Sequence, residues 1–259
     1  MIGAVTGDII GSVHEFIATK QTSFPLFTSA TRFTDDSVLT IAVADCILTG
    51  ASYVDKFHEY TRAYPDRLYG GGFMRWVESG NREPYNSWGN GSAMRVSPVG
   101  HAFDDADSVL AEARRSAEVT HNHPEGIKGA QATALSVFMA RSGSSKDELR
   151  ATVSSQFGYD LDRSIEGIRP DYEFNESCQG TVPEAIIAFL DSNDYESAIR
   201  LSISLGGDAD TLACITGGIA AAFYGGVPEE IAGPALQLLD GPLREVVDSF
   251  CERFNVPTV

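Results

Sequence analysis

Apolar residues recur at helical spacing through almost the whole chain, and no segment shows the sustained alternation that predicts a β-strand. Asp36 to Leu48 (DSVLTIAVADCIL) is apolar on most sides, which predicts a mostly buried helix with acids at its N-terminal end. Similar patterns predict helices over Ala106–Val119, Glu125–Ala140, Pro183–Leu190, Tyr195–Leu205, Thr211–Tyr224, Glu229–Leu239 and Leu243–Phe254. We therefore expect an all-α fold, a single compact multi-helix domain over residues 1–259.

Prolines and loops punctuate this pattern. We expect Pro183, Pro228 and Pro242 each to stand at or before a helix start, where a missing N–H does no harm. The longest loop-like stretches are Pro65–Gly72, Arg82–Ser92 and Asp160–Thr181. Long loops in a compact helical protein often carry function.

The composition excludes several classes of protein. With 36 Asp and Glu against 19 Lys and Arg the net charge is −17, which disfavours binding to nucleic acid or to an anionic membrane. The sequence contains no run of eighteen apolar residues and no basic leader, so we expect no membrane span and no signal peptide. The four cysteines are far apart and form no CxxC pair, which indicates reduced, buried thiols. We expect a cytoplasmic protein, with a monomer favoured.

Two acidic segments each precede a buried helix. They are Thr34-Asp35-Asp36-Ser37 and Gly206-Gly207-Asp208-Ala209-Asp210-Thr211. Ordinary helix capping would explain one acid at each place. Several carboxylates converging near a core repel one another unless a cation neutralises them, and oxygen ligands favour Mg²⁺, Mn²⁺ or Ca²⁺. A third acidic signal, Asp8 and Glu15, has a seven-residue spacing that would place both on one face of the first helix.

The remaining polar motifs are weaker. No pair of histidines has the spacing of a zinc site, so we expect most histidines to be surface or core residues, with His121 a weak exception. The stretch from Asn86 to Arg95 (NSWGNGSAMR) supplies backbone N–H groups for phosphate oxygens and an indole for stacking. It lacks the GK[ST] ending of a Walker loop, and a structural turn would explain it as well.

Four motifs in this order resemble the ADP-ribosylglycohydrolase family: FTDDS, GNGSAMR, THNHPEG and GGDADTLACITGGIAAAFYG. With GDIIGSVHE at the start, the resemblance covers nearly the whole chain. It implies a helical, di-metal hydrolase with two Mg²⁺ or Mn²⁺ ions. The positions that match the family's metal ligands are Thr34, Asp35, Asp36, Asp208, Asp210 and Thr211.

The resemblance also implies the other site residues. Glu15 and Asp35 are the expected catalytic residues, with Glu15 as general base; a solvated helix acid is the alternative for Glu15. Asp8 is expected to support the metal-site helix through hydrogen bonds. The expected ligand contacts, including Trp88 stacked on adenine with Met94 beneath it, are Ser87, Trp88, Gly89, Asn90, Gly91, Met94 and His121. Tyr69–Phe73 would border the pocket.

The function implied by the resemblance is metal-dependent hydrolysis of the glycosidic bond between ADP-ribose and a modified side chain. Arginine on a protein is favoured, because a guanidinium suits an acidic rim. A serine linkage, a small ADP-ribosyl ester and an ADP-ribose-binding protein without catalysis remain alternatives. A phosphatase or nucleotide pyrophosphatase using the same acids is a further alternative. The expected partner is thus an ADP-ribosylated protein or a small ADP-ribosyl conjugate.

Overall fold

Helix α13 (Ala209–Tyr224) runs through the middle of the molecule, and Ala209 to Ala221 are all buried. The coordinates are a computed structural model that describes residues 1–257, in which every regular element is a helix, so the all-α prediction is confirmed. The helices packed around α13 are α1 (Ile2–Gly11), α2 (Asp35–Thr49), α5 (Gly91–Met94), α6 (Ser97–Ala102), α8 (Pro124–Arg141), α11 (Cys178–Asp191) and α12 (Tyr195–Ile203).

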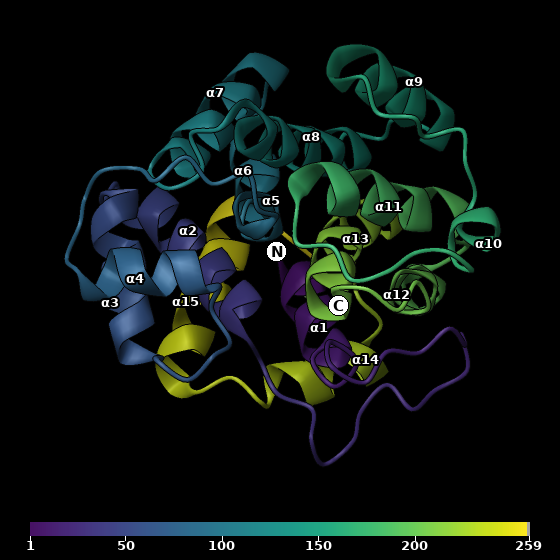
Figure 1. The fold of residues 1–259 in the computed structure, drawn as a ribbon, viewed down its shortest axis with the longest axis horizontal. Coiled ribbons are helices and arrows are strands. Elements are labelled where there is room, and N and C mark those ends of the chain that lie inside the picture. Colours follow the sequence, from purple (N-terminus) through teal and green to yellow (C-terminus); the bar gives the residue numbers. More distant parts are fainter. Residues whose placement is uncertain (258–259) are drawn as a thin grey trace.

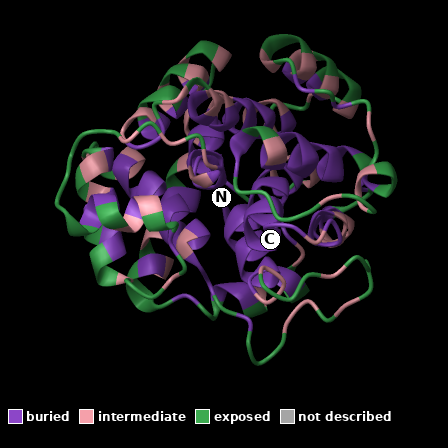
Figure 2. Cartoon of the chain, viewed as in Figure 1, coloured by how far each residue is buried: buried purple, intermediate pink, exposed green. Residues whose placement is uncertain are grey.

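The remaining helices cover this centre from outside (Figures 1 and 2). Near α2 lie α3 (Tyr53–Ala63), α4 (Gly71–Glu78) and α15 (Gly241–Phe254). Against α8 lie α7 (Ala106–Glu118) and α9 (Lys146–Phe157), while α10 (Ile165–Ile168) contacts α11 and α14 (Glu229–Leu236) contacts α1. Their outer faces are exposed and the inner helices are buried, which is the pattern of one hydrophobic core.

The contact between α1 and α13 is unusually close because every fourth residue of α1 is glycine. A Cβ atom built at Gly3, Gly7 or Gly11 would lie 2.2, 2.0 or 2.5 Å from a backbone oxygen of α13. No side chain fits at these distances, so the two helix backbones touch. This contact joins the first helix to one that begins about 200 residues later.

The structure corrects several predicted boundaries. Pro183 lies inside α11, because Ser177 caps that helix and starts it at Cys178. The predicted loop from Asp160 to Thr181 therefore contains α10 and the first turn of α11. Sequence analysis also missed α3, α4 and α9, although a capping box at Ser145 and Glu148 marks the start of α9.

Two expectations of the composition concern chemistry and membranes. All four cysteines are buried and unpaired, so the prediction of reduced, buried thiols is confirmed. Within residues 1–257, no helix is both long enough and apolar enough to cross a bilayer.

Candidate active site

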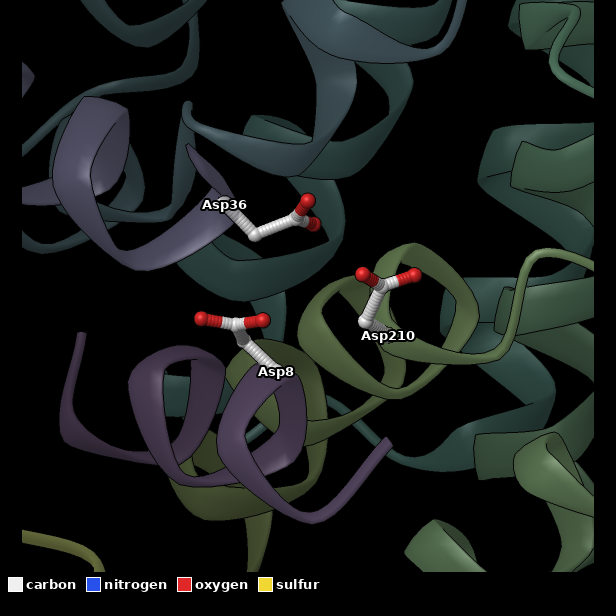
Figure 3. A group of neighbouring side chains, drawn as sticks. All are labelled: Asp8, Asp36 and Asp210. Carbon is white, nitrogen blue, oxygen red and sulfur yellow. The ribbon is translucent and has the colours of Figure 1, made fainter. Parts of the chain in front are cut away.

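Three buried carboxylates from three different helices meet at one point (Figure 3). Asp8 of α1, Asp36 of α2 and Asp210 of α13 each offer an oxygen atom, and these oxygens lie within 4.8 Å of one another. Among residues 1–257 this is the only such group of three or more candidate metal ligands, and it contains no His or Cys. The close α1–α13 contact brings Asp8 to Asp210.

Asp8 holds the start of α2. Its Oδ2 accepts hydrogen bonds from the backbone N–H of Thr34 at 3.0 Å and of Ser37 at 3.1 Å, and from the Ser37 hydroxyl. Its Oδ1 accepts from the Thr34 hydroxyl at 2.5 Å. This agrees with the supporting role expected for Asp8, but its place in the carboxylate group was not predicted.

Asp36 and Thr211 bring together the two acidic segments of the sequence. Thr211 Oγ1 donates to Asp36 Oδ2 at 3.3 Å across 175 residues of sequence. The second oxygen of Asp36, Oδ1, is buried and has no hydrogen-bond partner among residues 1–257. A buried carboxylate oxygen without a donor is costly, so this atom needs a partner of positive charge.

Capping explains only part of the two segments. Thr34 caps α2, because its Oγ1 accepts from the Asp36 N–H, and Asp35 and Asp36 are not needed for that bond. Asp208 stands at the N-cap of α13 without a side-chain capping bond; its Oδ2 instead accepts from Asn90 Nδ2 at 2.8 Å. The carboxylates therefore have no capping task that accounts for their number.

Without a cation, the negative charges of the carboxylates Asp35, Asp36, Asp208 and Asp210 are unfavourable so close together. Burial, followed by repulsion from Asp210 and Asp8, raises the pKa of Asp35 and Asp36 well above the usual range. Burial, followed by repulsion from Asp208, also raises the pKa of Asp210 well above the usual range. Burial raises the pKa of Asp208 to about 6. Neutralisation by a hard cation would remove this strain.

The donor set fits Mg²⁺ or Mn²⁺. It consists of carboxylate and hydroxyl oxygens, which hard divalent cations prefer, and it includes the partnerless Asp36 Oδ1. Of the six predicted metal ligands, Asp35, Asp36, Asp208, Asp210 and Thr211 line one cavity. Thr34 is buried, and its hydroxyl is already committed to Asp8.

Glu15 reaches the same cavity from a different position than predicted. Helix α1 ends at Gly11, so Glu15 lies in the turn that follows and the one-face argument was wrong. Its side chain nevertheless lines the cavity, and its Oε2 is buried without a hydrogen-bond partner among residues 1–257. Burial, then repulsion from Asp210, raises the pKa of Glu15 to about 8.

The cavity has a volume of about 430 Å³ and extends from the acidic group to the predicted ligand loop. All seven predicted ligand residues line it: Ser87, Trp88, Gly89, Asn90, Gly91, Met94 and His121. Trp88 is 46% exposed, so part of this residue is accessible to a ligand that stacks on it. Met94 is buried, with its Sδ 4.0 Å from Thr211 Oγ1, at the acidic end. Gly70 to Phe73 also line the cavity, as expected for the Tyr69–Phe73 segment.

The ligand loop is held by its backbone. The Asn90 N–H donates to the Glu176 carbonyl at 2.8 Å, and the Trp88 carbonyl accepts from the Cys178 N–H at 3.0 Å. The N–H groups of Ser87 and Gly89 are also bonded within the protein. Among residues 1–257 this leaves the N–H groups of Trp88, Gly91 and Ser92 as the free donors of the stretch from Asn86 to Arg95, fewer than the sequence suggested.

Several lining residues were not predicted. Arg95 closes the GNGSAMR motif but had no assigned role, and it is the only Lys or Arg among the lining residues within 1–257. Tyr85, Phe174 and Glu176 also line the cavity. Phe174 and Glu176 lie in the loop before α11, whose sequence carries no signal for this role.

Comparison with known proteins agrees with this architecture. A solved structure named "ADP-ribosylglycohydrolase-related protein complex" superposes with a TM-score of 0.74 and 26% sequence identity, over 99% of this chain and 95% of that one. The mouse protein named ADP-ribosylhydrolase ARH3 is 28% identical, over 87% of this chain and 82% of its own length.

A bacterial relative and the family pattern complete the comparison. ADP-ribosylarginine hydrolase Tri1 of Pseudomonas putida is 26% identical, over 89% of this chain and 71% of its own length. The sequence pattern of the family described as ADP-ribosylglycohydrolase matches residues 1–258. The match covers nearly the whole chain, and the helical fold agrees with it. The chain therefore belongs to the ADP-ribosylglycohydrolase family.

Proposed function

We propose that this protein hydrolyses the glycosidic bond between ADP-ribose and a modified side chain, in a reaction that requires Mg²⁺ or Mn²⁺. The observation that carries the proposal is the convergence of three buried carboxylates beside one cavity. Two of them, Asp36 and Asp210, line it together with a loop suited to a nucleotide. Family membership supports an ADP-ribosyl substrate.

In this proposal two cations are held by Asp35, Asp36, Asp208, Asp210 and Thr211, with Asp8 and Thr34 holding the start of α2 in place. When bound, such cations supply the positive charge that these carboxylates lack and polarise oxygen atoms of the substrate.

Glu15 is the proposed general base. A pKa of about 8 keeps its carboxyl protonated at pH 7 while the neighbouring carboxylates are not neutralised. Positive charge beside Asp210 lowers that pKa, so the carboxylate can then take a proton from a water molecule. The carboxylate-rich wall also favours the positive charge that develops on the ribose as the bond breaks.

Arginine is the proposed acceptor side chain. Before cleavage, the positively charged guanidinium of the modified arginine would lie beside Glu15 and Asp35, whose carboxylates suit it. The neutral guanidine that leaves would take up the proton that Glu15 accepted from water. The similarity to Tri1, which is named an ADP-ribosylarginine hydrolase, supports the same linkage. A serine or ester linkage would place a neutral group there and would use this acidic rim less well.

The test is release of ADP-ribose from arginine-ADP-ribosylated protein, with Mg²⁺, Mn²⁺ or EDTA, analysed by chromatography. We expect intact ADP-ribose with either metal and none with EDTA. Asp210→Asn should lower the rate by at least about a hundredfold, since it removes a carboxylate from the shared site. Serine-linked and ester-linked substrates, run in parallel, decide the linkage.

Asp45→Asn is the matched control. Asp45 lies on α2 like Asp36, but it pairs with Lys56 at 2.9 Å and Tyr60 at 2.9 Å on another side of the helix. Its rate should stay close to that of the wild type. AMP or phosphate as product would replace the glycohydrolase by a pyrophosphatase or phosphatase, and tight ADP-ribose binding without turnover would favour a binding protein.

A further inference from the structure

A buried cation lies behind the ligand loop. Arg95 is fully buried, with its guanidinium carbon 4.2 Å from the centroid of the Phe57 ring. Its Nη2 donates to the Ser116 carbonyl and to Thr120 Oγ1, both at 2.9 Å. A guanidinium has donors only, so the Thr120 oxygen must act as the acceptor in this bond.

The Thr120 hydroxyl determines which ring nitrogen of His121 carries the proton. Its oxygen lies 2.8 Å from His121 Nδ1, and Thr120 is fully buried. Among residues 1–257, Nδ1 is the only acceptor in reach of the hydroxyl hydrogen, because its other neighbour, Arg95, can only donate. A hydrogen on Nδ1 would leave the Thr120 O–H buried without an acceptor. The hydroxyl therefore donates to Nδ1, and the proton of a neutral His121 is on Nε2.

His121 Nε2 faces the ligand loop. A Cβ atom at Gly91 would lie 3.2 Å from Nε2, and one at Gly89 would lie 3.7 Å away, so glycine leaves this space open. Nε2 has no hydrogen-bond partner among residues 1–257, yet it is not sealed from solvent as the Nε2 of His101 is. Burial, with a smaller contribution from Arg95, lowers the pKa of His121 well below its usual value, which agrees with a neutral ring.

We propose that Arg95 and Thr120 are positioning residues, which hold His121 in the tautomer that presents Nε2–H to the cavity beside Gly91. The group that accepts this hydrogen bond is an acceptor atom of the ligand; that the ligand is ADP-ribose rests on the proposed function. Because the relay consists only of the protein's own groups, these groups orient the donor before a ligand binds, and binding needs no further ordering of His121.

The tautomer can be read directly by NMR. In protein labelled with ¹⁵N-histidine, a long-range ¹H–¹⁵N correlation at pH 7 distinguishes the protonated from the unprotonated ring nitrogen. The His121 signals are those that disappear in His121→Gln. We expect Nε2 protonated and Nδ1 unprotonated in the wild type, and loss of this single tautomer in Thr120→Val.

Binding gives a second readout. With Mg²⁺ present, Thr120→Val should weaken ADP-ribose binding about fivefold to tenfold in calorimetry, because the donor is no longer fixed. Thr133→Val is the matched control: it makes the same exchange at a buried hydroxyl of α8 that has no hydrogen-bond partner among residues 1–257. It should change neither the spectrum nor the affinity.

Each outcome of these measurements either supports or overturns the proposal. A wild-type His121 that is protonated on Nδ1 or charged at pH 7 overturns the proposal, and so does an unchanged tautomer in Thr120→Val. The wild-type spectrum suffices for the first of these results, even if Thr120→Val does not fold. The expected tautomer in a protein that binds no ADP-ribose would support the relay and contradict the proposed function.

Discussion

The acidic end of the cavity is formed by side chains of α2, of the start of α13 and of the turn after α1, whereas the opposite end is formed by a loop and a buried arginine. At the acidic end, Asp8, Asp36 and Asp210 repel one another, and a bound cation would neutralise them. At the opposite end, the buried Arg95 donates to Thr120, and we propose that His121 presents a donor to the ligand. The comparison teaches that one cavity is prepared for positive charge at one end and for an electron-rich ligand at the other.

The largest expected effect concerns the rigidity of the acidic end. Gly7→Ala places a Cβ atom 2.0 Å from the Ala213 carbonyl oxygen, so α1 must move away from α13. We expect the free energy of unfolding in urea to fall by about 3 kcal/mol. Gly241→Ala, where nothing lies within 4 Å of the added atom, is the control and should cost little. Equal stability of the two variants would mean that the glycine contact does not hold this end together.

The second prediction concerns the neutralisation of the acidic end by a bound cation. Saturating Mg²⁺, at about a hundred times its Kd, should raise the free energy of unfolding by about 3 kcal/mol. Asp36→Asn should abolish this gain, because it removes a carboxylate whose Oδ1 has no other partner among residues 1–257. Asp45→Asn should keep the gain. Stabilisation of both variants alike by Mg²⁺ would place the cation elsewhere.

The third prediction is a pH dependence of the metal-free protein. Burial raises the pKa of Asp208 to about 6 from 3.8, so above pH 6 the folded state bears the full penalty of a buried charge. As the pH falls through 6 toward 4, the folded protein takes up a proton that the unfolded chain does not, and stability rises. From this carboxyl we expect a gain of about 1.4 kcal/mol between pH 8 and pH 5, because pH 5 lies one unit below its folded pKa.

This gain should disappear in saturating Mg²⁺, where the carboxylate is already compensated. It should also shrink in Asp208→Asn, which has no charge to lose. Unfolding curves over the pH range, recorded with EDTA and with Mg²⁺, make the comparison. A metal-free protein that loses stability steadily below pH 8 would contradict the account of the acidic end.

The smallest expected effect tests whether the two ends of the cavity act independently. Trp88→Ala should weaken ADP-ribose binding about fivefold, since it removes one stacking surface worth about 1 kcal/mol. The Mg²⁺-dependent stabilisation should be unchanged, because within residues 1–257 Asn90, and not the Trp88 side chain, is the loop residue that bonds a proposed cation ligand, Asp208. Leu238→Ala, at another exposed apolar residue outside the cavity, should alter neither quantity. A loss of Mg²⁺ stabilisation in Trp88→Ala would show that the ends are not independent.

Much of the site could be predicted from sequence because its residues are adjacent to strong local signals. The pairs Asp35-Asp36 and Asp208-Asp210 stand at the starts of two buried helices, and both now line one cavity. The family resemblance pointed to Glu15, whereas the argument that placed it with Asp8 on one face of the first helix was wrong, since the chain turns after Gly11. The loop donors were overestimated, because a sequence does not tell which N–H groups are used by Glu176 and its neighbours.

The sequence by itself determined the all-α class, the longer inner helices and the types of ligand atom, because these depend on residues within a few positions of one another. Only the tertiary structure decided that Asp8 joins Asp36 and Asp210, and that Arg95 lies against Thr120. Both results depend on contacts between distant parts of the chain. The separation of two helices depends on the smallest side chains between them, and here glycines on α1 let the backbones touch and bring the carboxylates together.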